Sequence, residues 1–223
     1  KTIRYFLSCL FIALSIHSIQ GNAQDIALYS SPPVVPGGAI PNVLFIVDNA
    51  ANWNSSAPAC SYADTGGAPS LGASTGGVEQ CALVNAINAL APAAGGPATV
   101  NIGIMVYNKN GMDTLYGCSS SGTGGCLMHP LTAMTTANIA TLVTKIKAWS
   151  GNNQQSNNGA TAQAMQEAWA YYAGKQGMSG ITYTSPALSG CQKNYAVFIG
   201  NAFASNGSPG DASAAPGAKL TAI

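Results

Sequence analysis

Oxygen-bearing side chains follow the apolar runs of this sequence at the points where an open α/β sheet would form a ligand site. Asp48 and Asn52 follow the first run, Asn201 follows the last, and Thr161 begins a helical stretch behind a polar loop. Ligands of such sheets bind outside the carboxyl ends of the strands, where the connections change direction. The sequence therefore predicts that these segments meet at one sheet edge and form a binding site from oxygen atoms.

A second pattern indicates different chemistry, that of a serine hydrolase. Residues 72–76 read GASTG, which matches G-x-S-x-G with Ser74 at its centre, and Asp113 and His129 follow in the order of orienting acid and general base. A nucleophile elbow has to follow a strand, whereas residues 61–71 are of turn-forming types. A secreted serine hydrolase is therefore the weaker alternative, and we expect His129 to lie at a strand end or in a loop.

The elements that must position these side chains alternate between strands and helices. Uninterrupted apolar and β-branched runs are typical of strands buried on both faces, and apolar residues at helical spacing are typical of amphipathic helices. The predicted strands are 42–47, 100–107 and 195–200, and the predicted helices are 78–90, 136–149 and 160–172.

This alternation predicts an α/β fold that is doubly wound, with a mainly parallel sheet and helices on both faces. A further short strand is expected at 124–134, at a sheet edge, because Pro130 cannot donate a hydrogen bond in the centre of a sheet. These runs supply fewer strands than a doubly wound sheet normally has. We therefore expect the C-terminal part of the domain to be incomplete.

The N-terminal segment has the features of a secretory signal peptide. Lys1 and Arg4 precede an apolar run at 5–16, and small residues lead to a cleavage point after Ala23. The run is shorter than the roughly 20 residues that span a membrane as a helix, so no membrane span is expected after cleavage. The predicted division is a signal peptide at 1–23, an extended Pro- and Gly-rich lead-in at 24–41 and a domain at 42–223.

Export would place the cysteines of the mature chain in an oxidising compartment, where thiols pair. Short loops favour a disulfide between Cys60 and Cys81 and another between Cys118 and Cys126, although spacing alone does not fix the pairing. Cys191 is left over. It either stays reduced and buried or pairs with a cysteine outside this sequence.

Charged residues are scarce throughout the chain. Of 223 residues only 7% are Asp, Glu, Lys or Arg, with 8 basic and 7 acidic side chains and a net charge of +1, whereas about a quarter is usual for globular domains. The chain has no basic surface that could neutralise phosphates, which argues against a nucleic-acid partner.

Two stretches together resemble a known family. PNVLFIVDNAANW at 41–53 and CQKNYAVFIGN at 191–201 are similar to the N-terminal von Willebrand factor A-like domain of PilY-type (PilC-like) tip adhesins of type IV pili, which read close to PNVLF-x-x-D-x-S-G-S-M and CQKN-x-x-x-x-x-TDG. The resemblance implies secretion to the cell surface, pilus tip or outer membrane, and roles in pilus assembly and attachment. It also implies a C-terminal β-propeller, to which nothing in this sequence corresponds.

In A-type domains of this kind the binding site is a metal-ion-dependent adhesion site. The resemblance implies Asp48, Asn52, Thr161 and Asn201 as ligands of Mg²⁺ or Ca²⁺. Ala50, in place of a family serine, has no ligand atom, and the two asparagine amides bring no charge. Affinity for the cation should therefore be weak. The alternative is that Asp48 and the asparagines hydrogen-bond the loop backbone without a cation.

These observations predict an exported adhesion and assembly module that binds and does not catalyse. Its expected partners are pilus components or a host or abiotic surface. They would be contacted at the top of the domain, where Trp53 is a candidate for the exposed binding surface. A metal-independent structural A-type module of the cell surface, unrelated to pili, stays open beside this prediction.

Overall fold

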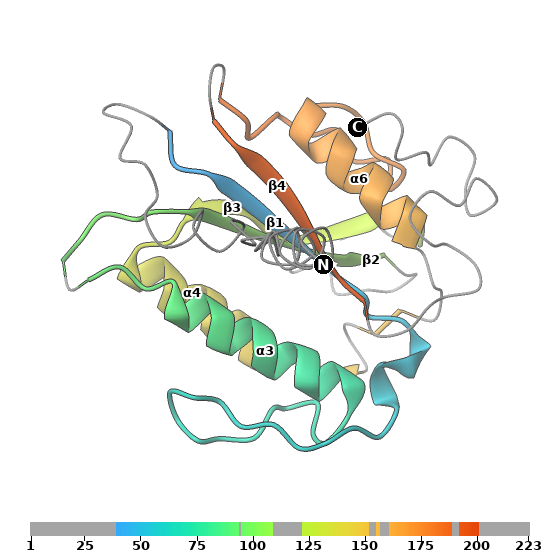
Figure 1. Cartoon of the computed structure of the whole chain (residues 1–223). Coiled ribbons are helices and arrows are strands. Elements are labelled where there is room, and N and C mark those ends of the chain that lie inside the picture. The colour runs from blue at the N-terminus through green and yellow to red at the C-terminus, as the bar shows by residue number, and fades with distance from the viewer. Residues whose placement is uncertain are drawn as a thin grey trace, which may run out of the picture. The chain divides into compact units, whose positions relative to one another are not determined.

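The computed structural model of the chain describes residues 39–93, 95–108, 122–151, 155–156, 161–188 and 192–200. Several predictions concern residues outside these ranges, namely the signal peptide at 1–23, Asp113, Cys118, Cys191 and Asn201. The described elements are β1 (Asn42–Val47), η2 (Ala51–Asn54, a short 3-10 helix), α3 (Thr75–Ala89), β2 (Asn101–Tyr107), β3 (Gly125–Ala133), α4 (Thr136–Lys147), α6 (Thr161–Ala173) and β4 (Asn194–Ile199) (Figure 1). None of the helices in this part of the chain has the length and apolar character needed to cross a membrane.

The described strands form one mainly parallel sheet in the order β3-β2-β1-β4. β1 runs parallel to both β2 and β4, whereas β3 runs antiparallel to β2. Pro130 lies in β3 with its side chain exposed, which suits an edge strand because proline has no donor for a further neighbour. The predicted α/β fold with a mainly parallel sheet is confirmed, and the strands lie within one residue of their predicted bounds.

Alternate side chains of the central strands pack into two hydrophobic clusters on opposite faces of the sheet. On one face Ile104 of β2 packs with Leu83 of α3 and Leu142 of α4. On the other face Met105 packs in a cluster with Ala168 of α6. Figure 1 shows α3 and α4 on one side of the sheet and α6 on the other. Burial on both faces explains why these strands read as continuous apolar runs.

Helix α3 begins three residues before the predicted start at Val78. The Ser74 side chain accepts a hydrogen bond from Gly77 N at 3.1 Å, the usual way of capping a helix N-terminus. Gly76 lies against the Trp53 ring, where a Cβ would come within 2.8 Å of ring carbons. Hydrophobic periodicity does not detect this first turn, because its glycines carry no apolar side chain. Val78, predicted for the apolar face, is exposed.

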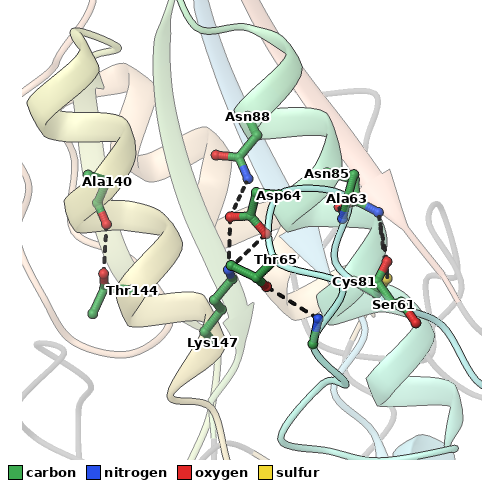
Figure 2. Close-up of polar contacts among 11 residues, drawn as sticks. Ser61, Ala63, Asp64, Thr65, Cys81, Asn85, Asn88, Ala140, Thr144 and Lys147 are labelled. Carbon is green, nitrogen blue, oxygen red and sulfur yellow. Dashed lines mark hydrogen bonds and ion pairs between the residues drawn. The ribbon is translucent and has the colours of Figure 1, made fainter.

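A disulfide and several polar contacts hold the segment before α3 to α3 and α4, and Figure 2 shows the polar contacts. The predicted disulfide between Cys60 and Cys81 is confirmed and spans a separation of 21 residues. Asp64 forms an ion pair with Lys147 of α4, with Oδ2 and Nζ 2.9 Å apart. It also accepts a hydrogen bond from Asn88 Nδ2 of α3 at 3.1 Å. The segment is therefore held to both helices.

The second predicted disulfide is described at one end only. Cys126, in β3, is disulfide-bonded, and Cys118 lies outside the described residues. The pairing of these two cysteines stays a prediction.

A buried carboxylate attaches the segment after α6 to that helix. Glu167 is fully buried. It accepts hydrogen bonds from Ser179 N at 2.9 Å, from the Ser179 hydroxyl at 2.5 Å and from the Tyr183 hydroxyl at 2.7 Å. Burial, and then the hydrogen bond and charge of Glu167, raise the pKa of Tyr183. Charge-assisted hydrogen bonds of this kind are stronger than neutral ones, so Glu167 fixes the segment that carries Ser179 and Tyr183.

Candidate functional site

Strands β1 and β2 end side by side, and Asn49 joins their ends. Val47 lies opposite Val106 in the parallel register. Just beyond them Asn49 Nδ2 donates to Tyr107 O at 3.1 Å, and Asn49 Oδ1 accepts from Tyr107 N at 2.8 Å. The side-chain amide of Asn49 is fully buried. It makes with Tyr107 the kind of paired hydrogen bonds that backbone groups make between neighbouring strands. This contact fixes the position of Asp48, which lies between β1 and Asn49.

Asp48 is buried at this edge of the sheet. Only 3% of the residue is exposed, and Oδ1 accepts a hydrogen bond from Ala50 N at 3.0 Å, a local contact typical of aspartate in turns. The carboxylate also acts on the Tyr107 hydroxyl. Burial is the largest cause of the raised pKa of Tyr107, and the charge of Asp48 and a hydrogen bond to Asp48 raise it further, while a hydrogen bond with Thr161 opposes them.

Thr161, the first residue of α6, contacts the same hydroxyl. Its Oγ1 lies 2.5 Å from the Tyr107 hydroxyl oxygen. Thr161 is 3% exposed and Tyr107 is fully buried. The structure therefore brings together two of the predicted ligand residues, Asp48 and Thr161. It does so at a tyrosine that the sequence did not single out.

Either hydroxyl of the Tyr107–Thr161 pair can donate to the other. The carboxylate of Asp48 can only accept, and its charge acts on the Tyr107 hydroxyl. Its raised pKa keeps Tyr107 protonated at neutral pH. We call Asp48, Tyr107 and Thr161 the hydroxyl bridge, because a single hydroxyl connects the end of β1 with the start of α6.

Neighbouring loops close around the hydroxyl bridge. Ser156, which precedes α6, donates from its backbone N to Asn49 O at 2.7 Å and from its hydroxyl to Asn108 O at 3.4 Å. Asn108 Nδ2 in turn donates to Thr123 O at 3.0 Å. The segments after β1, after β2 and before α6 therefore meet at the carboxyl edge of the parallel strands, where open sheets bind ligands.

Trp53 is not an exposed binding residue, and that prediction is wrong. Only 1% of it is exposed. Its ring packs against Trp149 with centroids 5.8 Å apart, and its Nε1 donates to Glu79 Oε2 at 2.6 Å. The physical reason is that the indole fits against α3 at Gly76, which has no side chain, and its N–H finds a buried carboxylate there.

The other predicted ligands contribute less to the described site. Asn52 lies half-buried in η2, and its backbone oxygen accepts from Ser55 N at 2.9 Å. Asn201 lies outside the described residues. Within those residues, no three His, Cys, Asp or Glu side chains gather so that they could hold a metal ion. Within the described part of the chain, an ion at this edge would depend on hydroxyl and amide oxygens around the carboxylate of Asp48.

The residues of the hydrolase pattern have structural contacts. Ser74 caps α3, and its hydroxyl donates to Leu71 O at 2.8 Å. His129 lies within β3, not at a strand end or in a loop as expected, and it is 7% exposed. Neither of its ring nitrogens hydrogen-bonds a described residue. Burial, and then the charge of Lys145, lower the pKa of His129 to about 4. Asp113 lies outside the described residues.

Comparisons of the chain with protein-family models, with curated proteins and with solved structures found no match. The class that the fold itself defines is an α/β domain with a mainly parallel sheet and a buried polar group at the carboxyl edge of its strands.

Proposed function

We propose that this chain is an exported adhesion and assembly module of a type IV pilus tip protein, which binds a surface or a protein partner through the carboxyl edge of an A-type domain. The observation that carries the proposal is the meeting of Asp48 and Thr161 at Tyr107. The resemblance to PilY-type tip adhesins assigns both residues to the ligand site. A shared ligand site requires the two residues to lie close together, and their approach to one hydroxyl group supports the proposal.

Among the described residues, the exposed side chains at the end of η2 and just after it are polar and uncharged. Asn54, Ser55 and Ser56 are exposed at the end of η2 and just after it, and Asn54 Nδ2 donates to Gln155 Oε1 at 2.9 Å. Charge complementarity sets the rate and salt dependence of association, and these three side chains offer none. The proposed partner, a pilus component or a host or abiotic surface, is therefore bound by hydrogen bonds and close contact.

The proposal is one of binding and not of catalysis. The Ser74 hydroxyl donates to Leu71 O and accepts from Gly77 N, so both of its contacts serve the start of α3. This supports a structural role for the G-x-S-x-G pattern.

The proposal is tested in cells that produce the chain. Removing its gene should reduce the number of surface pili, the attachment of the cells to glass, or both, and the wild-type chain should restore them. Asp48→Ala should reduce attachment several-fold. Asp64→Ala is the matched control, because it removes an aspartate from the segment in Figure 2 and leaves the hydroxyl bridge intact. Immunoblots of the exported chain separate lost binding from lost protein. Unchanged pili and attachment after gene removal contradict the proposal.

A further inference from the structure

We infer that the Tyr107 hydroxyl occupies the position that a cation takes in a metal-ion-dependent adhesion site. The hydroxyl holds together the segments at this edge of the domain, and the domain binds its partner without Mg²⁺ or Ca²⁺. The inference rests on the proposed function, since only the A-type resemblance implies an ion here. It makes the binding module independent of divalent cations.

The Tyr107 hydroxyl lies close to where a shared ion would have to bind. An ion shared by Asp48 and Thr161 would need both oxygens about 2.0 to 2.6 Å away. The Tyr107 oxygen already lies 2.5 Å from Thr161 Oγ1, and the register in which Val47 lies opposite Val106 brings Asp48 beside Tyr107. A protonated phenol is a poor ligand for a hard cation, since it brings no charge. The same oxygen therefore fills the position and contributes little to holding an ion.

The Asp48 carboxylate has a hydrogen-bond donor of its own. Asp48 Oδ1 accepts from Ala50 N at 3.0 Å, and its charge acts on the neighbouring Tyr107 hydroxyl. Hydrogen bonds to the charged form stabilise a buried carboxylate. The Ala50 N–H, with the Tyr107 hydroxyl beside the carboxylate, thus stabilises Asp48 where a cation would otherwise do so.

The residues of the hydroxyl bridge are not accessible from outside the domain. A metal-dependent adhesion site works by leaving one coordination position open to a carboxylate of the partner. Asp48, Tyr107 and Thr161 are all nearly or fully buried. Ala50, at the position of a family serine, has no oxygen in its side chain. The hydroxyl bridge therefore presents no coordination position to the outside, and the partner meets other side chains, among them the exposed Asn54, Ser55 and Ser56.

The test follows the melting temperature of the purified chain while MgCl₂ or CaCl₂ is raised to about 10 mM, with KCl of matched ionic strength as the control. A bound ion raises the apparent stability with its concentration. We expect the wild-type melting temperature to change by less than about 1 °C relative to KCl. A saturable rise of several degrees with either cation overturns the inference.

Two tyrosine variants test the part played by the hydroxyl. Tyr107→Phe should lower the melting temperature by about 3 to 10 °C, because it leaves buried polar groups without their partner. Tyr172→Phe is the matched control. It removes a hydroxyl that donates to Tyr195 O at 2.9 Å, and it should lower the melting temperature less. Equal effects of the two variants contradict the inference. Should Tyr107→Phe not fold, Thr161→Val replaces it, with Thr161→Ser expected to retain most of the wild-type stability.

Attachment of beads coated with the purified chain to glass separates this inference from the proposed function. Attachment that is the same in EDTA and in Mg²⁺ supports the inference, and attachment that EDTA abolishes overturns it while the proposed function stands. Failure to attach under any condition counts against the proposed function, and the melting temperatures still decide whether an ion binds.

Discussion

Replacing both Cys60 and Cys81 by alanine is expected to lower the free energy of unfolding by about 3 kcal/mol. The disulfide spans 21 residues, and a cross-link of this length restricts the unfolded chain by roughly that amount at 25 °C. The contacts of Asp64 with Lys147 and Asn88 hold the same segment without the disulfide. The folded structure should therefore persist, and the loss should arise mainly in the unfolded state.

Urea unfolding followed by circular dichroism measures this loss directly. The double variant is preferable to a reducing agent, because Cys126 is also disulfide-bonded and would be reduced as well. Asp64→Ala serves as the control and should shift the midpoint far less, since exposed ion pairs contribute little. A loss below about 1 kcal/mol for the double variant would refute the reasoning, because the cross-link would then not limit the unfolded chain.

Three further predictions concern the buried histidine, the buried glutamate and the scarcity of charge. Between about pH 6.5 and pH 4 the unfolded chain protonates His129 and the folded chain does not. The free energy of unfolding should therefore fall as the pH falls. In urea titrations, His129→Leu should remove on the order of 1 to 3 kcal/mol of this pH dependence. A variant with the same pH dependence as the wild type would contradict this role of His129. Glu167→Gln should lower the free energy of unfolding by about 2 to 4 kcal/mol, because the amide cannot accept all three hydrogen bonds of the carboxylate; a loss under about 1 kcal/mol argues against a role for the charge. Attachment should change less than about twofold between 50 and 500 mM NaCl, because the chain is only 7% charged; a tenfold fall would reveal a charged contact.

The pattern of apolar residues along the sequence predicts the strands of this fold well, because a strand buried on both faces is an unbroken apolar run. The runs at 42–47 and 100–107 match β1 and β2 within one residue. Pro130 places β3 at an edge of the described sheet, because a residue without a donor is tolerated there. The start of α3 is harder to predict, since Ser74 fixes it by a hydrogen bond and the following glycines add nothing to the periodicity.

The site is predictable only in part, because its contacts depend on strand register and on packing between distant segments. Asp48 and Thr161 could be selected from the chain, since both lie at ends of elements that meet at one edge. Tyr107 reads as a core residue of an apolar strand. Its position level with the end of β1 is set by the pairing of Val47 with Val106. A polar group at the last position of a buried strand is the signal that could have identified it. The inward turn of Trp53 depends on Gly76, which no local pattern connects with it.

A double-mutant cycle on Tyr107→Phe and Thr161→Val tests the hydroxyl bridge most directly. The free energies of unfolding of the wild type, both single variants and the double variant give the coupling between the two side chains. Since the two oxygens lie 2.5 Å apart in a buried site, we predict a coupling energy of about 1 to 2 kcal/mol. Effects that add within about 0.5 kcal/mol would contradict a contact between β2 and α6 at this edge.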